Sequence, residues 1–187
     1  MRYPFFAIGL LLSSSFAQAS VVVGGTRLVF DGTKNNAVIT VENKDQNSNI
    51  VQSWLSVVDA ASPAKDAFII TPPLFRLKAG EKGFVRVVRS GKKLPDDRES
   101  MFWLNIKGIP ATEYVPDKNV VQFAINSKIK LIYRPAALKG NTPEAYAEKL
   151  QWGKEGTSVT VKNNSPLYMN CLLYTSDAAD EADSVDL

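Results

Sequence analysis

Histidine is absent from the 187-residue sequence, and cysteine occurs once, as Cys171. Without histidine, the Ser-His-Asp and Cys-His nucleophilic systems are excluded, together with every metal site that needs an imidazole ligand. A single cysteine cannot form a disulfide within the chain, even in an oxidising compartment. No pair of carboxylates stands out as an acid and a base. The sequence therefore predicts no catalytic residue, no metal site and no bound cofactor.

A long hydrophobic run that could span a membrane is also missing. An apolar stretch at residues 5–12 follows the basic residue Arg2, and it is too short to cross a bilayer. After it comes the small-residue pattern Ala17-Gln18-Ala19. A basic start, an apolar centre and such an end are typical of a cleavable secretory signal. We expect residues 1–19 to be a signal peptide and the mature protein to begin at Ser20 in the periplasm.

Net charge is low, at +3, but it is unevenly distributed. Basic side chains outnumber acidic ones over residues 20–139, whereas residues 172–187 hold acidic side chains and no basic one. The basic residues are spread among expected strands and turns, which disfavours nucleic acid as a partner. We interpret the basic part as a surface suited to an anionic protein group, with an ordinary solvated face as the alternative.

Helical periodicity is lacking in the first two thirds of the chain, where short apolar or alternating runs recur instead. They lie at residues 26–30, 37–41, 50–58, 67–70 continued by 74–77, 84–89, 101–107 and 120–133. Turn residues separate them at the spacing of a sandwich, so the pattern predicts an all-β, immunoglobulin-like fold. Pro72 and Pro73 cannot donate to a ladder, and we expect an edge strand or a bend between sheets there, compatible with a cis bond.

Beyond this first domain, expected at residues 20–135, the composition changes. Residues 136–143 resemble a linker, residues 144–150 fit a short helical turn, and residues 157–162 and 167–174 are strand-like. A second β domain is expected to begin at residue 144. Residues 144–171 are too few to close a sandwich, so we expect this domain to be incomplete. The acidic end at 172–187 is either a disordered extension or, as we favour, not native to the fold, as in a truncated or frame-shifted reading.

Three segments together resemble the PapD-like periplasmic pilus-assembly chaperones. They are TRLVFDG at residues 26–32, LPDDRESMFWLN at 94–105 and KIKLIYRP at 128–135. The resemblance covers residues 20–170 and implies two immunoglobulin-like domains set at an angle, with no enzymatic activity. It also implies that the protein stabilises pilus (fimbrial) subunits by donating a strand to their incomplete sandwich. Its expected partners are these subunits and an outer-membrane usher.

The resemblance also implies roles for single residues. Arg27 and Lys130 match two basic residues that anchor the C-terminal carboxylate of a subunit. Glu99 and Arg134 match residues of a charge network that joins the two domains, whose third member, an aspartate, would lie in the missing part of the second domain. By default, isolated cations such as Arg27 and Lys130 are ordinary solvated side chains.

Three alternating apolar residues, Val121, Phe123 and Ile125, match those that the long strand of such a chaperone inserts into the groove of a subunit. Alternation places the three side chains on one face of a strand. Alternation alone favours a different reading, in which they point into this protein's own core. Other functions also stay open at this point: an immunoglobulin-like exported adhesin or pilus structural subunit, and an exported enzyme with a Ser-Lys or carboxylate site.

Overall fold

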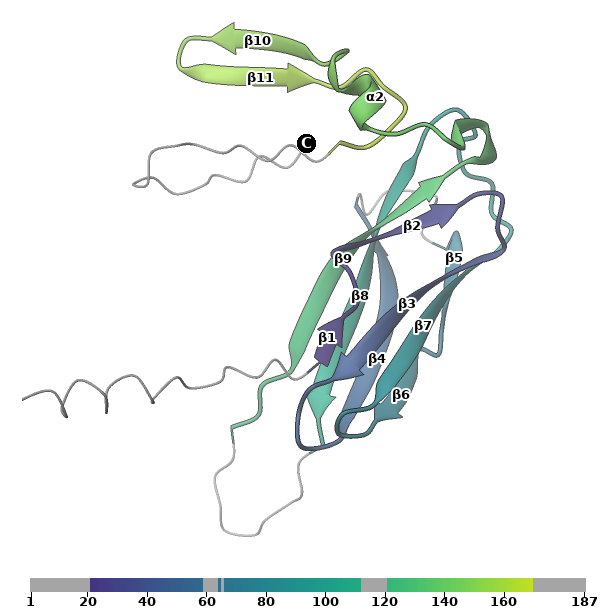
Figure 1. Cartoon of the computed structure of the whole chain (residues 1–187), viewed down its shortest axis with the longest axis vertical. Coiled ribbons are helices and arrows are strands. Elements are labelled where there is room, and N and C mark those ends of the chain that lie inside the picture. The colour runs from purple at the N-terminus through teal and green to yellow at the C-terminus, as the bar shows by residue number, and fades with distance from the viewer. Residues whose placement is uncertain (1–20, 59–63, 65, 112–120, 170–187) are drawn as a thin grey trace, which may run out of the picture.

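The computed structural model describes residues 21–58, 64, 66–111 and 121–169, and every structural statement below refers to these. The expected signal peptide, Val120 and the acidic tail lie outside the described residues. Strands dominate and form two sheets and a separate hairpin (Figure 1). The prediction of an all-β sandwich is confirmed.

The two sheets differ in the direction of one strand pair. The first sheet has the order β1-β3-β7-β5 and is antiparallel throughout. Its strands are β1 (Val21–Val23), β3 (Asn36–Asn43), β7 (Lys82–Arg89) and β5 (Phe68–Thr71). The second sheet has the order β2-β9-β8-β4-β6, and only β2 and β9 run parallel. Its strands are β2 (Arg27–Asp31), β9 (Ile125–Arg134), β8 (Ser100–Pro110), β4 (Asn49–Val57) and β6 (Leu74–Leu77).

The core between the sheets is centred on aromatic side chains. The ring centroid of Phe68 on β5 lies 5.1 Å from that of Phe30 on β2 and 5.2 Å from that of Phe102 on β8. Tyr133 on β9 joins the cluster, 6.0 Å from Phe68. Tilted and edge-on aromatic pairs contribute about 0.5–1.5 kcal/mol beyond the burial of their area. These contacts hold the C-terminal half of β9 firmly against the first sheet.

The proline pair marks the place where the chain changes sheets. The Thr71–Pro72 peptide is cis, and β5 and β6 on either side of it are edge strands of different sheets. Ser53 on β4 binds the backbone of this bend. Its N–H donates to the Pro73 carbonyl and its hydroxyl donates to the Pro72 carbonyl, both at 2.8 Å. The predicted bend between sheets is confirmed.

At the turn that follows β2, Gly32 forms a hydrogen bond with the end of β9. The backbone N–H of Gly32 donates to the carbonyl of Arg134 at 2.7 Å. A Cβ at this position would lie only 2.7 Å from that oxygen and 2.9 Å from Cα of Pro135. Glycine therefore permits the close approach that sets where β9 ends and the next segment begins.

The segment after β9 contains short elements. They are η1 (Ala136–Leu138), α2 (Glu144–Ala147), β10 (Gln151–Glu155) and β11 (Ser158–Lys162). The predicted helical turn is confirmed as α2, and the predicted strand at 157–162 as β11. Strand β10 was not predicted, because Gly153, Lys154 and Glu155 are disfavoured in strands. A two-residue turn with Gly156 at φ +61° brings it against β11.

The strand predicted at 167–174 is wrong for its described part, residues 167–169. Leu167 is buried, and its carbonyl accepts hydrogen bonds from Asn163 Nδ2 at 2.8 Å and Ser165 Oγ at 3.1 Å. Local side-chain bonds of this kind compete with strand pairing. The segment forms a turn beside Glu99 instead.

Candidate functional site

Arg27 and Lys130 lie side by side on neighbouring strands. The parallel register of β2 and β9 places Arg27 directly opposite Lys130. Phe30 and Leu131 point into the core, so alternation puts Arg27 and Lys130 on the outer face of the same sheet. Arg27 is exposed and Lys130 is half-buried. Pairing of β2 with β9 thus brings together two cations that are far apart in the sequence.

Strand β9 is only partly covered along the edge that faces β2. β2 pairs with β9 from Lys130 to Arg134, whereas β8 pairs with the other edge from Ile125 to Tyr133. Among the described residues, no strand pairs with residues 125–129 on the β2 side. Such an edge presents unpaired N–H and C=O groups to another chain. The open edge ends where the Arg27–Lys130 pair begins.

The apolar residues before and at the start of β9 are uncovered. The exposed fractions of Val121, Phe123 and Ile125 are 79%, 77% and 54%. In an extended chain they share a face with Ile129 and Leu131, which are buried in the core. The core-facing side of β9 therefore continues past the end of this protein's own core.

Strand β9 begins later than the sequence predicted. The expected strand from Val120 is wrong for residues 121–124, which precede β9 and belong to no strand. A strand forms by pairing, and the described residues offer these positions no partner strand. Gln122 instead donates a side-chain hydrogen bond to the carbonyl of Pro110.

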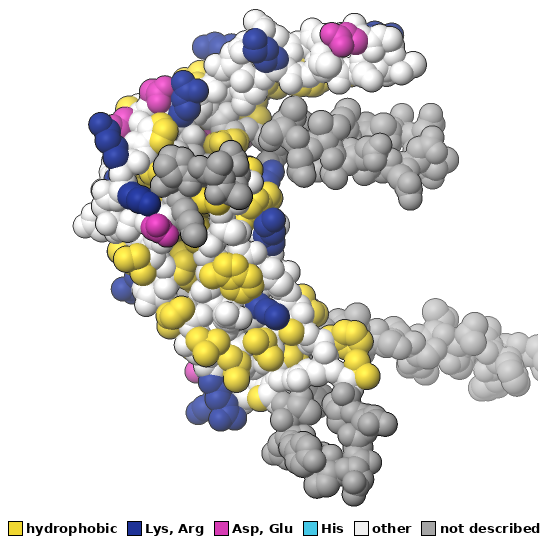
Figure 2. All heavy atoms as spheres, turned by 180° about the vertical axis from the view of Figure 1, so that it is seen from behind, with side chains coloured by type: hydrophobic (Ala, Val, Ile, Leu, Met, Phe, Trp, Pro, Cys, Tyr) yellow, Lys and Arg dark blue, Asp and Glu magenta, His cyan; other side chains and the backbone are white. Residues whose placement is uncertain are grey.

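Aromatic and basic side chains flank the Arg27–Lys130 pair. Trp103 on β8 lies opposite Lys130, and Lys128 Nζ lies 4.5 Å from the centroid of a Trp103 ring. Figure 2 shows one face of the molecule, with hydrophobic side chains spread over the sandwich and Lys and Arg among them. The sequence analysis missed Trp103, although its alternation with the buried residues Phe102 and Leu104 on β8 places it on the outer face.

Glu99 and Arg134 form an ion pair at the end of the sandwich. Arg134 Nε donates to Glu99 Oε1 at 2.7 Å. The Arg134 side chain is 23% exposed and the Glu99 side chain is 1% exposed. The other oxygen of Glu99 accepts from the N–H of Tyr168 at 2.7 Å, and the N–H of Glu99 donates to the Pro166 carbonyl at 2.9 Å. Arg134 Nη1 donates to the carbonyl of Asn141 at 3.0 Å. The sequence analysis missed these three partners because they are backbone groups.

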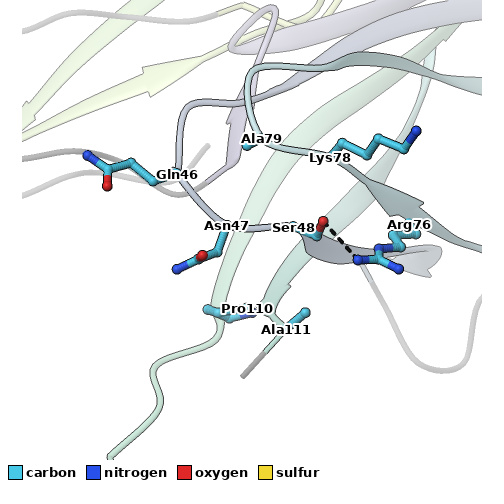
Figure 3. A pocket seen from close by; sticks show the side chains of 8 residues that line it. All are labelled: Gln46, Asn47, Ser48, Arg76, Lys78, Ala79, Pro110 and Ala111. Atoms are coloured by element: carbon cyan, nitrogen blue, oxygen red, sulfur yellow. Dashed lines mark hydrogen bonds between the residues drawn. The ribbon is translucent and has the colours of Figure 1, made fainter. Parts of the chain in front are cut away.

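A cavity of about 760 Å³ opens where β4 begins and β8 ends, and Figure 3 shows the side chains that line it. Ser48 Oγ there accepts a hydrogen bond from Arg76 Nη2 at 3.1 Å, and an arginine stays protonated and cannot act as a base. Figure 3 shows Lys78 pointing away from Ser48. The lining residues include no carboxylate. They offer no base for a serine nucleophile.

Metal-ligand clusters and membrane-spanning helices are both missing from the part of the chain that the structure describes. That part contains no group of three or more His, Cys, Asp or Glu that could hold a metal ion. None of its helices has the length and apolar character needed to cross a membrane.

Comparison with known proteins decides the family. A family model described as the pili and flagellar-assembly chaperone, PapD N-terminal domain, matches residues 20–139. The chain belongs to this chaperone family. The probable fimbrial chaperone LpfB of Escherichia coli O157:H7 is 40% identical over 164 residues, which are 87% of this chain and 69% of that protein. Chaperone protein FimC of Escherichia coli K12 is 38% identical over 156 residues, covering 82% of this chain and 64% of that protein.

Solved structures of related chaperones share the fold of this chain. The Salmonella enterica SafB chaperone, solved in complex with the SafA pilin, superposes with a TM-score of 0.73 at 36% identity, covering 83% of this chain and 73% of that one. The Escherichia coli chaperone DraB superposes with a TM-score of 0.69 at 38% identity, covering 81% of this chain and 71% of that one. The immunoglobulin-like fold and the resemblance to periplasmic pilus chaperones are therefore confirmed. The curated relatives named here are chaperones, which leaves the adhesin and enzyme alternatives without support.

Proposed function

We propose that this chaperone captures pilus subunits in the periplasm at the open edge of β9 and delivers them to an outer-membrane usher. Residues 1–19 would direct export as a signal peptide and be cleaved to give a mature protein that begins at Ser20. The observation that carries the proposal is an edge that stays open over residues 125–129 and ends at the pair formed by Arg27 and Lys130. The structure of SafB in complex with a pilin supports the choice of partner.

The position of β2 sets the direction of an incoming strand. β2 occupies the same edge of β9 from Lys130 onward, so an added strand has to stop at that point. If it runs parallel to β9, as β2 does, its last residue and its terminal carboxylate arrive beside Arg27 and Lys130. An antiparallel strand would bring its N-terminus there, and a positive amine is unfavourable next to two cations. Capture of a chain terminus also fixes the register of the adjoining strand.

The exposed apolar residues supply the side-chain part of the interaction. In strand addition, main-chain hydrogen bonds provide affinity and pockets for alternate side chains provide specificity. Val121, Phe123 and Ile125 continue the core-facing side of β9 without a core to enter. We propose that they fill the core of an incomplete subunit sandwich. Full burial of each such side chain is worth about 1.5–3 kcal/mol.

Replacement of Val121, Phe123 and Ile125 together by Ser tests this role. We expect affinity for a pilus subunit to fall at least about 100-fold, because three apolar contacts are lost. The free energy of unfolding should change by less than about 1 kcal/mol, since these side chains are already exposed. Binding is measured with a purified subunit and stability by urea denaturation.

The matched control is Leu131→Ala, on the same strand and face but fully buried. It should lose about 2–5 kcal/mol of stability. A triple Ser variant as unstable as Leu131→Ala would place the three residues in the protein's own core, and the proposed role would be wrong.

We propose in addition that Glu99 and Arg134 hold the sandwich and the segment that follows it in a fixed arrangement. Glu99 binds the backbone at Tyr168 and Pro166, and Arg134 binds the backbone at Asn141. These bonds tie the end of the sandwich to both sides of the β10–β11 hairpin. The arrangement would keep the region beyond residue 134 fixed at the end of the sandwich where β9 stops.

A further inference from the structure

Trp103 lies beside the Arg27–Lys130 pair, on the side of β9 away from the open edge. The register of β8 and β9 places Trp103 opposite Lys130, whereas Arg27 lies opposite Lys130 on the β2 side. Lys128 is the preceding outward residue of β9, and its Nζ lies 4.5 Å from the centroid of a Trp103 ring. An aromatic face attracts a cation at this distance. The Lys128 side chain is therefore held toward β8 and away from the open edge.

A buried amide holds the same part of β9 against β8. Asn105 lies on the outer face of β8 but is only 4% exposed. Its Oδ1 accepts a hydrogen bond from Asn126 Nδ2 at 3.3 Å, and its Nδ2 donates to Ser56 Oγ on β4 at 2.9 Å. Buried polar networks make their surroundings rigid. The two outward polar side chains at the start of β9, Asn126 and Lys128, thus both contact β8 side chains.

A released Lys128 would compete with Lys130 for a terminal carboxylate. The two lysines lie on the same face of β9 and are separated by about 7 Å along the strand. A shift of an added strand by two residues keeps each side chain on its face, so alternation does not exclude it. A carboxylate bound at Lys128 would stop the strand before it reached Arg27. A released cation at position 128 would therefore permit a second register of capture.

We propose that Trp103 is a positioning residue that withholds Lys128 from the terminal carboxylate of a subunit. It thereby restricts capture to the register that ends at Arg27 and Lys130. This inference rests on the proposed function, because the ligand is taken to be the end of a strand added to β9. Trp103 needs no contact with that strand, which would lie across β9 from it. It acts through the Lys128 side chain.

A rescue experiment with the full chain tests this role. The probe is a peptide that carries the last residues of a pilus subunit and ends in a free carboxylate. Lys130→Ala should bind it weakly, and adding Trp103→Ala should raise the affinity about threefold or more, because Lys128 is released to bind the carboxylate. Adding Lys128→Gln to this double variant should abolish the gain. Lys128→Gln alone should leave binding unchanged.

Two further substitutions separate the aromatic face of Trp103 from its bulk. Trp103→Leu keeps an apolar side chain over β8 without an aromatic face, so it should rescue Lys130→Ala as Trp103→Ala does. Trp103→Phe keeps an aromatic face and should give little rescue. Urea denaturation shows which variants are folded. Folded Trp103→Ala or Trp103→Leu variants that give no rescue would overturn the proposal.

One comparison separates this inference from the proposed function. If Lys130→Ala and amidation of the peptide both weaken binding but Trp103 variants give no rescue, only the role of Trp103 is wrong. If neither change weakens binding to the chain with Trp103 intact, the carboxylate site itself is wrong, and the role of Trp103 is overturned with it.

Discussion

Arg27→Ala and Lys130→Ala are each expected to weaken, by tens to thousands of fold, the binding of a peptide that carries the last residues of a pilus subunit. The register of β2 and β9 holds the two cations as neighbours at the end of an open strand edge. Once a bound strand excludes water, loss of one partner of a charged pair costs about 2–5 kcal/mol. If the carboxylate stayed in solvent, either substitution would lower the binding free energy by only about 0–1 kcal/mol. Titration calorimetry with the full chain distinguishes the two cases.

The matched controls change one charge at a time. Arg76→Ala removes an exposed cation from another strand of the same sheet and should leave peptide binding unchanged. Amidation of the peptide's terminal carboxylate should weaken binding to the unmodified protein about as much as either substitution does. The Arg27 and Lys130 variants should lose little more with the amidated peptide. If the unmodified protein binds both peptides equally, these residues do not hold a carboxylate.

Glu99→Ala is expected to lower the free energy of unfolding by about 3–5 kcal/mol. The Glu99 side chain is almost fully buried and carries bonds from Arg134 and from the Tyr168 N–H. Removing one partner of a buried ion pair leaves the other charge without compensation. Because the lost bonds also hold the backbone at Tyr168, hydrogen exchange of residues 163–168 should accelerate.

Asp97→Ala provides the comparison from the same loop. Its ion pair with Arg98 is formed by two side chains that are each 67% exposed, so its loss should cost about 0–1 kcal/mol. Glu99→Gln keeps an oxygen acceptor of similar shape and should lie between the two. Equal stability of the Glu99→Ala and Asp97→Ala variants would show that the buried pair does not hold this end of the sandwich together.

The sandwich could be predicted because its sequence carries local signals. Alternation in runs such as 37–41 and 84–89 reflects one buried and one exposed face. Pro72-Pro73 marks a change of sheet because neither proline can donate a hydrogen bond to a strand ladder. The start of β9 carries no such signal. Val121 and Phe123 alternate like Ile129 and Leu131, but whether they form a strand depends on a partner strand, which is not a property of their own sequence.

The candidate site was predictable only in part. The resemblance led to Arg27, Lys130, Glu99 and Arg134, and the structure brings them together in two pairs. Their roles in binding stay predictions. The bonds from Glu99 to the backbone of residues 166 and 168 could not be read from sequence, because every residue carries the same backbone groups, apart from the N–H that proline lacks.

Hydrogen exchange of the complex between this chaperone and a pilus subunit tests the central claim most directly. If a strand of the subunit is added at the open edge, those amides of residues 121–129 that point to this edge should exchange far more slowly in the complex than in the free protein, whereas the amides bonded to β8 are already protected. Protection should end at Lys130, where β2 already pairs with β9. Unchanged exchange over residues 121–129 in a stable complex would contradict capture at this edge.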